Sequence, residues 1–554
     1  MKARALLTAA ALLGALAAGL AITGAGGAAN NGSGTEPFPQ SVTHEHYNFF
    51  QGPVTEAGEG VVSTGSYRNP PSPICSTPTS SAANVNTDCE GVAPHNETAI
   101  AVNPTNGNNM IGSANDYQLG LSPGGGINET AHSRAHVTFD GGQTWTTYPV
   151  DYASYAATGD PGLAFDAAGN AYLSTLGFVW SQGAGCCTNP DILVSHSGDG
   201  GQTWSKPSRV ASGSGSFSSV GTFNDKEAIA AWGNGNAIVT WTVFNDGQLG
   251  SYINSPIYAS VTHDGGKTWS QRVQISGSAS FCAGAQGGTA CDQDQGSVPS
   301  VAADGSIYVA FMNYANDPTG RDQYVVVKVD PATGARIAGP YKVAGLYDGF
   351  TDYPHNIYGD QTYQDSQFRT WAFGNIATDP TNAAHMAVIW SDMRNSTLPA
   401  PNDPFAATTN SDVVVSQSTN GGATWSAPTA LAASGDQFMP WGAYDTSGLL
   451  RIGYFDRSYD AANHLYGYTL ATETVPGSLT FTKTQVTTTL SDPTLNDRWF
   501  SGAAPNHATT FLGDYSGIAA TPSGGVASYW TDMRNNVCFT VRCGWGEDAY
   551  FGLK

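Results

Sequence analysis

Positive charge is scarce in this chain. The 554 residues include 22 Lys and Arg against 44 Asp and Glu, which gives a formal net charge of −22. So little basic surface argues against nucleic-acid binding, and a polyanionic substrate would need a local Arg cluster to receive it. The sequence contains no Gly-x-Ser-x-Gly elbow and no phosphate-binding loop, and its 11 His residues show no metal-ligand spacing.

Long apolar runs are also missing beyond the start of the chain. Met1–Arg4 is short and basic, Ala5–Ile22 is apolar, and small residues follow to Ala29. This order predicts a signal peptide over residues 1–29, cleaved near Ala29, with an uncleaved anchor as the alternative because the run approaches spanning length. We therefore expect a secreted, extracellular protein with no membrane contact after cleavage.

The eight Cys residues form an even set in a chain that is expected to be exported, which predicts disulfide bonds. Local spacing suggests three pairs: Cys75–Cys89, Cys282–Cys291 and Cys538–Cys543. Cys186 and Cys187 are then left as sequence neighbours. They form a vicinal disulfide, a rigid apolar plate that could support a ligand ring, or they pair elsewhere or stay free.

A short sequence motif recurs four times, each time between a β-rich run and an extended segment. Its copies end in Asp-Gly-Gly-x-Thr-Trp or the Asn variant and span 138–145, 197–204, 262–269 and 418–425. The Asp carboxylate can accept backbone N–H bonds across a turn, and Gly allows positive φ, so each copy predicts a tight hairpin. The third residue of each copy is expected to be structural: Asp140, Asp199, Asp264 and Asn420. The Trp is expected to fill the gap between neighbouring repeats.

These four copies resemble the Asp-box, or BNR repeat, of sialidase-like β-propellers. In that family the box lies on the turn between the two outer strands of a blade, away from the active site. The resemblance therefore implies a propeller fold and says little about the reaction.

Pairs of short apolar strands recur seven times after Asn96. The first strands are Thr98–Val102, Gly162–Phe165, Ala228–Ala231, Val298–Ala302, Gly374–Thr378, Pro440–Tyr444 and Ser516–Ala520. The second strands are Asn109–Ala114, Ala171–Thr175, Ala237–Trp241, Ile307–Met312, Met386–Trp390, Leu450–Phe455 and Val526–Trp530. This pattern predicts an all-β protein with one propeller of seven four-stranded blades over residues 91–554, with six blades as the alternative.

The last unit is one strand short. Residues 30–90 form an irregular leader rich in Ser, Thr, Pro and Gly, and part of it, around Ser41–Phe50, is expected to supply the closing strand.

In a propeller, the start of each innermost strand and the end of the next strand lie on one face around the central channel. Acids gather at the first of these positions: Glu97, Asp160, Asp225, Glu227, Asp292, Asp294, Asp436 and Asp514. Crowded like charges raise each other's pKa, which suits general acid–base catalysis. Alternatively, the acids accept N–H bonds from adjoining blades or bind a channel ion or water. The catalytic candidates are Asp160, Glu227, Asp436 and Asp514.

Asp/Arg pairs gather at the second position: Asp392 with Arg394, Asp456 with Arg457, and Asp532 with Arg534. A guanidinium matches a carboxylate geometrically, so the three Arg either bind a substrate carboxylate or form ion pairs with their neighbouring Asp. The candidate substrate-binding set is Arg394, Arg457, Arg534, Asp392, Asp532 and Trp441, whose indole could stack on a sugar or pack between blades.

Sialidases hold the substrate carboxylate with three Arg, so the resemblance implies that Arg394, Arg457 and Arg534 form such a clamp. The nucleophilic Tyr of sialidases and its Glu partner cannot be carried over residue by residue. Tyr515 is a candidate nucleophile only by its position beside Asp514, with a nearby carboxylate activating it. The family's Phe/Tyr-Arg-Ile-Pro motif is absent, and Arg134 and Arg369 are poor substitutes for its Arg.

No cofactor is expected. The run Asp292–Gly296 starts like a calcium loop, but Ala303 stands where a bidentate Glu is needed, so calcium is only an alternative. The sequence predicts a sialidase-like glycoside hydrolase that acts on terminal sugars of a glycan or polysaccharide. The alternatives are a non-catalytic glycan- or protein-binding propeller, and a polysaccharide hydrolase or lyase with an open cleft.

Overall fold

A computed structural model of the chain contains strands and no α-helix in the part that it describes. The described residues are 75–76, 84–87 and 94–554, the last range without 122–126, 153–154, 156, 179–189, 215–220, 248–250, 315, 318, 397–402, 496, 498–499, 501–503 and 540–541. The predicted signal peptide, Cys89, Cys186 and Cys187 lie outside these residues. No helix in the described part is long and apolar enough to span a membrane.

Seven antiparallel sheets form the seven blades that the sequence predicts, and this prediction is confirmed. Blade 1 contains β3 (His95–Val102), β4 (Met110–Leu121), β6 (Ala135–Thr138) and β7 (Thr144–Tyr148), with β5 (Ile127–Ala131) and β1 (Cys75–Ser76) at its edges. Blade 2 contains β8 (Ala157–Phe165), β9 (Ala171–Phe178), β10 (Asp191–Ser197) and β11 (Ser208–Ala211). Blade 3 contains β12 (Gly221–Trp232), β13 (Asn236–Asp246), β14 (Tyr252–Asn254), β15 (Ile257–Thr262) and β16 (Val273–Gln274).

The remaining four blades repeat this antiparallel order. Blade 4 contains β17 (Asp294–Val301), β18 (Ile307–Asn313), β19 (Gln323–Val329) and β20 (Arg336–Gly345). Blade 5 contains β21 (Asn375–Thr378), β22 (Met386–Asp392), β23 (Asp412–Ser418) and β24 (Thr429–Ala430). Blade 6 contains β25 (Gln437–Tyr444), β26 (Leu450–Asp456), β27 (Gly467–Glu473) and β28 (Phe481–Gln485). Blade 7 contains β29 (Gly517–Ala520), β30 (Val526–Phe539), β31 (Arg542–Leu553) and β2 (Val85–Asn86), and a 3₁₀ turn (η2, Pro505–His507) precedes it.

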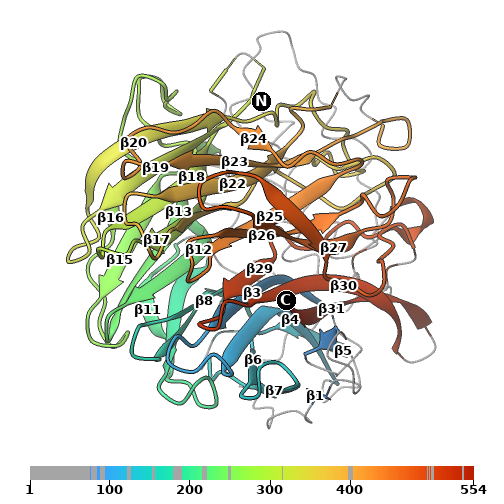
Figure 1. Cartoon of the computed structure of the whole chain (residues 1–554), viewed down its shortest axis with the longest axis horizontal. Helices are drawn as coiled ribbons and strands as arrows, with labels where there is room; N and C mark the ends of the chain where they lie inside the picture. The colour runs from blue at the N-terminus through green and yellow to red at the C-terminus, as the bar shows by residue number, and fades with distance from the viewer. Residues whose placement is uncertain are drawn as a thin grey trace.

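The ring closes between blades 7 and 1. Each innermost strand contacts the next, and β29 contacts β3, so the blue and red ends of the chain lie side by side in Figure 1. The outermost strand of blade 7 is β2, where Val85 pairs with Phe551 and Asn86 with Tyr550. A segment ahead of the first blade thus completes the last one; the segment Ser41–Phe50 lies outside the described residues.

The four recurring hairpins share one set of hydrogen bonds. In the first, the Asp140 carboxylate accepts from the backbone N–H of Gln143 and Thr144, each at 2.9 Å. Asp199, Asp264 and Asn420 accept the N–H of their own Thr in the same way. Each turn joins the two outer strands of its blade. The fully buried Trp145 of the first turn packs on Phe551 of blade 7, with ring centroids 4.9 Å apart.

The disulfide Cys282–Cys291 is present, which confirms that predicted pair. The register of β30 and β31 sets Cys538 directly opposite Cys543.

The closing strand gives a test of ring stability. Val85 is 4% exposed and packs with Trp145 and Phe551. Since Val85→Asp places a charge in this apolar contact, we expect it to lower the free energy of unfolding by at least about 2 kcal/mol in denaturant titration. The control Val475→Asp, at a site 60% exposed, should change it by less than about 0.5 kcal/mol. Equal effects of the two substitutions would contradict closure by β2.

Candidate functional site

Innermost strands of five blades carry an extra residue at the same point. Their register shifts fall between Asn96 and Ala99, Gly159 and Gly162, Asp225 and Ala228, Gln295 and Val298, and Phe438 and Trp441. One residue in each bulge has positive φ: Glu97 (53°), Asp160 (55°), Lys226 (47°), Gly296 (66°) and Met439 (47°). The innermost strands begin earlier than the sequence predicted, for example at His95, Ala157 and Gly221, so several acids that were expected ahead of these strands lie inside them. The bulge interrupts the alternation of side chains at that point.

The identity of the bulge residues is informative. A left-handed backbone costs a residue other than Gly about 1 kcal/mol or more. Blade 4 avoids this cost with Gly296, where a Cβ would stand 2.5 Å from the ring of Phe373. Blades 1, 2 and 3 instead keep Glu97, Asp160 and Lys226 in the strained conformation, and blade 6 keeps Met439, which packs in an apolar cluster. The strain alone therefore does not mark a functional residue, but in blades 1 to 3 it falls on charged side chains.

These side chains meet at the Lys226 ammonium. Its Nζ lies 2.9 Å from Oε1 of Glu97, 3.1 Å from Oδ2 of Asp160 and 2.7 Å from Oδ2 of Asp514. Asp514 precedes β29 of blade 7, and its neighbour Gly513 has φ 87°. A Cβ at Gly513 would stand 2.5 Å from the Glu97 nitrogen, so only Gly allows this approach.

Two further residues complete what we name the channel cluster: Glu97, Asn115, Asp160, Lys226, Arg369 and Asp514. The Arg369 guanidinium binds both oxygens of Asp514, with Nε donating to Oδ1 at 2.8 Å. The Asn115 amide donates to Glu97 at 2.6 Å, and its oxygen accepts the Asp160 N–H at 2.7 Å. All six residues are at most 5% exposed, so their charges depend on one another rather than on water.

The pKa values follow from this burial. Burial and the neighbouring Asp160 raise the pKa of Glu97 well above its ordinary value, and burial raises the pKa of Asp160. Burial also acts to raise the pKa of Asp514, but the Arg369 and Lys226 cations hold it below its usual range. Two cations face three acids, and Asp225 adds to the negative potential at Asp160, so burial favours a proton on at least one acid. We assign that proton to Glu97, whose carboxyl hydrogen-bonds to Asp160.

A small pocket adjoins the cluster. Its charged wall consists of Glu97, Asp160, Asp225, Lys226 and Arg369, and its apolar wall of Leu176, Phe178, Phe223 and Phe511. Its free volume of about 10 Å³ is enough for about one water molecule, so a sugar would contact the outer edge of these side chains unless they move apart.

The structure brings some of the predicted catalytic residues together. Asp160 and Asp514 lie in the channel cluster. Glu227 follows Lys226 and is 5% exposed; burial raises its pKa, and neither carboxylate oxygen hydrogen-bonds to another described residue. Tyr515 is half-buried, and the Lys226 ammonium lies 5.7 Å from its ring centroid. Burial raises the pKa of Tyr515, with Glu97 adding to the shift, so its hydroxyl holds its proton strongly.

Asp436 lies apart from the channel cluster. Its carboxylate accepts from Thr409 at 2.7 Å, the Ser411 N–H at 2.9 Å and Asn463 at 2.8 Å. It also faces the fully buried Arg457 at 3.5 Å. Asp436 therefore binds loops of blades 5 and 6 together.

The other predicted Arg residues are held by their own neighbours. Arg394 donates to both oxygens of Asp392 at 2.8 and 2.6 Å, and Arg534 does the same with Asp532. Trp390 and Trp530 donate to these same carboxylates, at 2.8 and 2.9 Å. For these two Arg residues this is the ion-pair arrangement that the sequence left open against a carboxylate clamp. Arg457 pairs with Asp436 in place of the expected neighbour Asp456. Trp441 packs between Phe373 and Tyr515, 6.2 Å from each ring centroid.

Sequence reasoning missed the two cations of the channel cluster. Lys226 stands between two acids in Asp225-Lys226-Glu227, and a cation among acids at an expected channel position was a usable signal. Arg369 belongs to the long segment before β21, so only the tertiary structure shows that it reaches Asp514.

No protein-family model matches the chain, and no curated protein matches it. Solved structures resemble it weakly. A protein of unknown function from Dyadobacter fermentans is 11% identical, with 72% of this chain and 94% of that chain covered and a TM-score of 0.43. A Hadza microbial sialidase is 12% identical, covering 77% and 75%, with a TM-score of 0.41. A Penicillium chrysogenum alpha-L-arabinanase in complex with arabinobiose is 11% identical, covering 83% and 93%, with a TM-score of 0.40. Likeness at this level says nothing about activity.

The channel cluster makes a prediction about stability and pH. Lys226→Met removes the ammonium from three buried carboxyl groups, so we expect a loss of about 3–5 kcal/mol in the free energy of unfolding at neutral pH. Without Lys226 the carboxyl pKa values rise, and these groups become neutral on acidification. The loss should therefore shrink as the pH falls toward about 5, while wild type loses the contribution of Asp514 only at lower pH.

Denaturant titrations at both pH values measure this difference. The control Lys328→Met removes a half-buried Lys whose ammonium lies 5.3 Å from the ring centroid of Tyr308. It should have a small effect that does not depend on pH over this range. A pH-independent loss for Lys226→Met would contradict the ionic account of the cluster.

Proposed function

We propose that this protein is a carbohydrate-active propeller and that the channel cluster performs acid–base chemistry on a glycan. The observation that carries the proposal is the Lys226 ammonium, which contacts carboxyl groups from three different blades beside a pocket with an aromatic wall. A buried ionic cluster adds less stability than apolar packing of the same volume would, so stability does not account for it and a chemical role is favoured.

The protonated Glu97 is the proton donor in this proposal. Its raised pKa keeps it protonated at a pH where an exposed Glu is ionised, and it lies in the pocket wall. Asp160, which shares its proton, accepts a proton from water or from a sugar hydroxyl. Lys226 and Arg369 stay charged and hold Asp514 ionised, so they fix the geometry of the pair and offset negative charge that develops on the ligand.

The hydrogen bond between Glu97 and Asp160 makes them one proton-carrying unit. Two carboxyl groups in contact are closer than the roughly 5 Å of retaining glycosidases or the roughly 6.5–9.5 Å of inverting ones. A second reactive group must therefore act with the pair. Tyr515 is the proposed nucleophile, because it lies beside the pair and Lys226; its tightly held phenol proton passes to the ionised Asp160 carboxylate as its oxygen attacks, while Glu97 protonates the leaving group.

The substrate we propose is a neutral sugar rather than a sialoside. Arg394 and Arg534 each bind a carboxylate of their own blade through two hydrogen bonds, and Arg457 is completely buried. A sialoside carboxylate would have to displace Asp392 from Arg394 or Asp532 from Arg534.

Non-catalytic glycan binding is the second candidate function. It is favoured by the small pocket and by the number of cluster carboxylates that already hold an ion pair. In either case we propose an exported protein, since the disulfide Cys282–Cys291 fits an oxidising compartment.

Activity on a panel of chromogenic glycosides, with neutral sugars and a sialoside, tests the proposal. We expect turnover of a neutral glycoside that falls at least about 100-fold in Glu97→Gln, since general acid catalysis contributes on this scale. Activity should also decline as the pH rises through the raised pKa of Glu97, because the proton donor is then lost.

The matched control is Glu473→Gln. Glu473 is 1% exposed and accepts the backbone N–H groups of Leu450 and Leu479 on blade 6, away from the channel cluster. It should keep wild-type turnover if the variant folds. Turnover that survives in Glu97→Gln would refute the assigned role, and a wild type that binds glycans without any turnover would establish the second candidate.

A further inference from the structure

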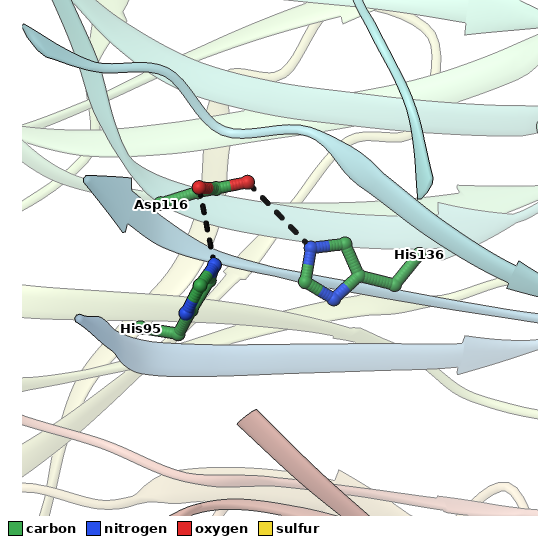
Figure 2. Close-up of side chains that lie close together, drawn as sticks. All are labelled: His95, Asp116 and His136. Carbon is green, nitrogen blue, oxygen red and sulfur yellow. Dashed lines mark ion pairs between the residues drawn. The ribbon is translucent and has the colours of Figure 1, made fainter. Parts of the chain in front are cut away.

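A second buried polar cluster lies in blade 1. It joins His95 on β3, Asp116 on β4 and His136 on β6, which are 1%, 0% and 0% exposed. Figure 2 shows the Asp116 carboxylate between the two imidazole rings, with one oxygen toward each. The three residues are well separated along the sequence. They come together because β3, β4 and β6 are neighbours in one sheet.

Their ligand atoms are arranged compactly. Nε2 of His95 lies 3.1 Å from Oδ1 of Asp116, and Nε2 of His136 lies 3.7 Å from Oδ2. All three potential ligand atoms lie within 4.8 Å of one another. A zinc ion with bonds of about 2.0–2.2 Å places neighbouring ligand atoms about 3–3.5 Å apart, so small side-chain shifts would complete such a site.

Contacts outside this trio fix its orientation. Nδ1 of His136 lies 2.9 Å from the Thr87 hydroxyl and 2.7 Å from the Tyr529 hydroxyl. These contacts leave Nε2 of His136 facing Asp116, and that nitrogen has no hydrogen bond to another described residue. Arg134 binds both oxygens of Asp116, with Nη2 donating to Oδ1 at 2.9 Å. A hydrogen bond on the second imidazole nitrogen and a donor on the carboxylate are the usual outer contacts of a metal site.

We propose that His95, Asp116 and His136 bind one divalent transition-metal ion, and that in the cell this ion is Zn²⁺. Two imidazoles and one carboxylate suit such an ion, with water as a further ligand. The ion stabilises the closure of the ring. The His136 ring contacts Thr87, which follows the closing strand β2, and Tyr529 on β30, so a fixed His136 ties blade 1 to both.

Metal content tests this proposal without reference to activity. The protein is produced with Zn²⁺ in the medium, dialysed against a chelator and measured by inductively coupled plasma mass spectrometry. Because the site is closed to solvent, the ion should enter during folding and survive dialysis at about one Zn²⁺ per chain. His136→Ala and Asp116→Asn should fall to background.

The matched control is His385→Ala. His385 is 6% exposed and contacts Asp379 at 3.0 Å, which makes it a buried His–Asp pair with no second His in contact among the described residues. This variant should keep the zinc of wild type. Equal zinc in His136→Ala and wild type would overturn the assignment.

Wild type alone gives a second measurement, in case the variants do not fold. Protein produced in zinc-depleted medium should unfold at a temperature several degrees below that of zinc-replete protein. Background zinc in the zinc-replete wild type, or identical unfolding temperatures of the two preparations, would overturn the proposal. Neither result depends on the glycan-processing role of the channel cluster.

Discussion

The centre of this propeller depends on one ammonium group. Lys226 contacts Glu97 of blade 1, Asp160 of blade 2 and Asp514 of blade 7, so a single cation joins blades on both sides of the ring closure. Seven sheets around a common axis bring the same point of each innermost strand together. Acids at that point would repel one another strongly if no cation lay among them.

Burial couples the protonation states of these groups to one another. Since the members of the channel cluster are nearly inaccessible to water, their charges must nearly cancel. Lys226 and Arg369 balance two of the three acids, and the third keeps a proton. The strained backbone at the bulges sets which side chains share this space. A proton held at Glu97 beside an aromatic-walled pocket is the property on which the proposed glycan chemistry depends.

The fold could be predicted largely from local signals. The recurring Asp-Gly-Gly turn depends on hydrogen bonds within a few residues, and the number of paired apolar strands gives the number of blades.

The site was predicted less completely. Asp160 and Asp514 were found because propeller geometry selects their positions. Arg369 was missed because its contact with Asp514 spans 145 residues and no local pattern encodes it. For Arg394 and Arg534 the Asp two positions earlier in the sequence already made an ion pair one of the two alternatives, and the structure shows that pair. The trio of His95, Asp116 and His136 depends on sheet register, which spacing along the chain does not reveal.

The protonation state of Glu97 is the central claim, and infrared spectroscopy measures it directly. The difference spectrum between wild type and Glu97→Gln at neutral pH isolates the carboxyl group of Glu97 from the other buried acids. We expect the wild type to show an additional C=O band of a protonated carboxylic acid, and this band should disappear as the pH is raised. A difference spectrum that contains only the bands of an ionised carboxylate would contradict the charge balance of the channel cluster and the role assigned to Glu97.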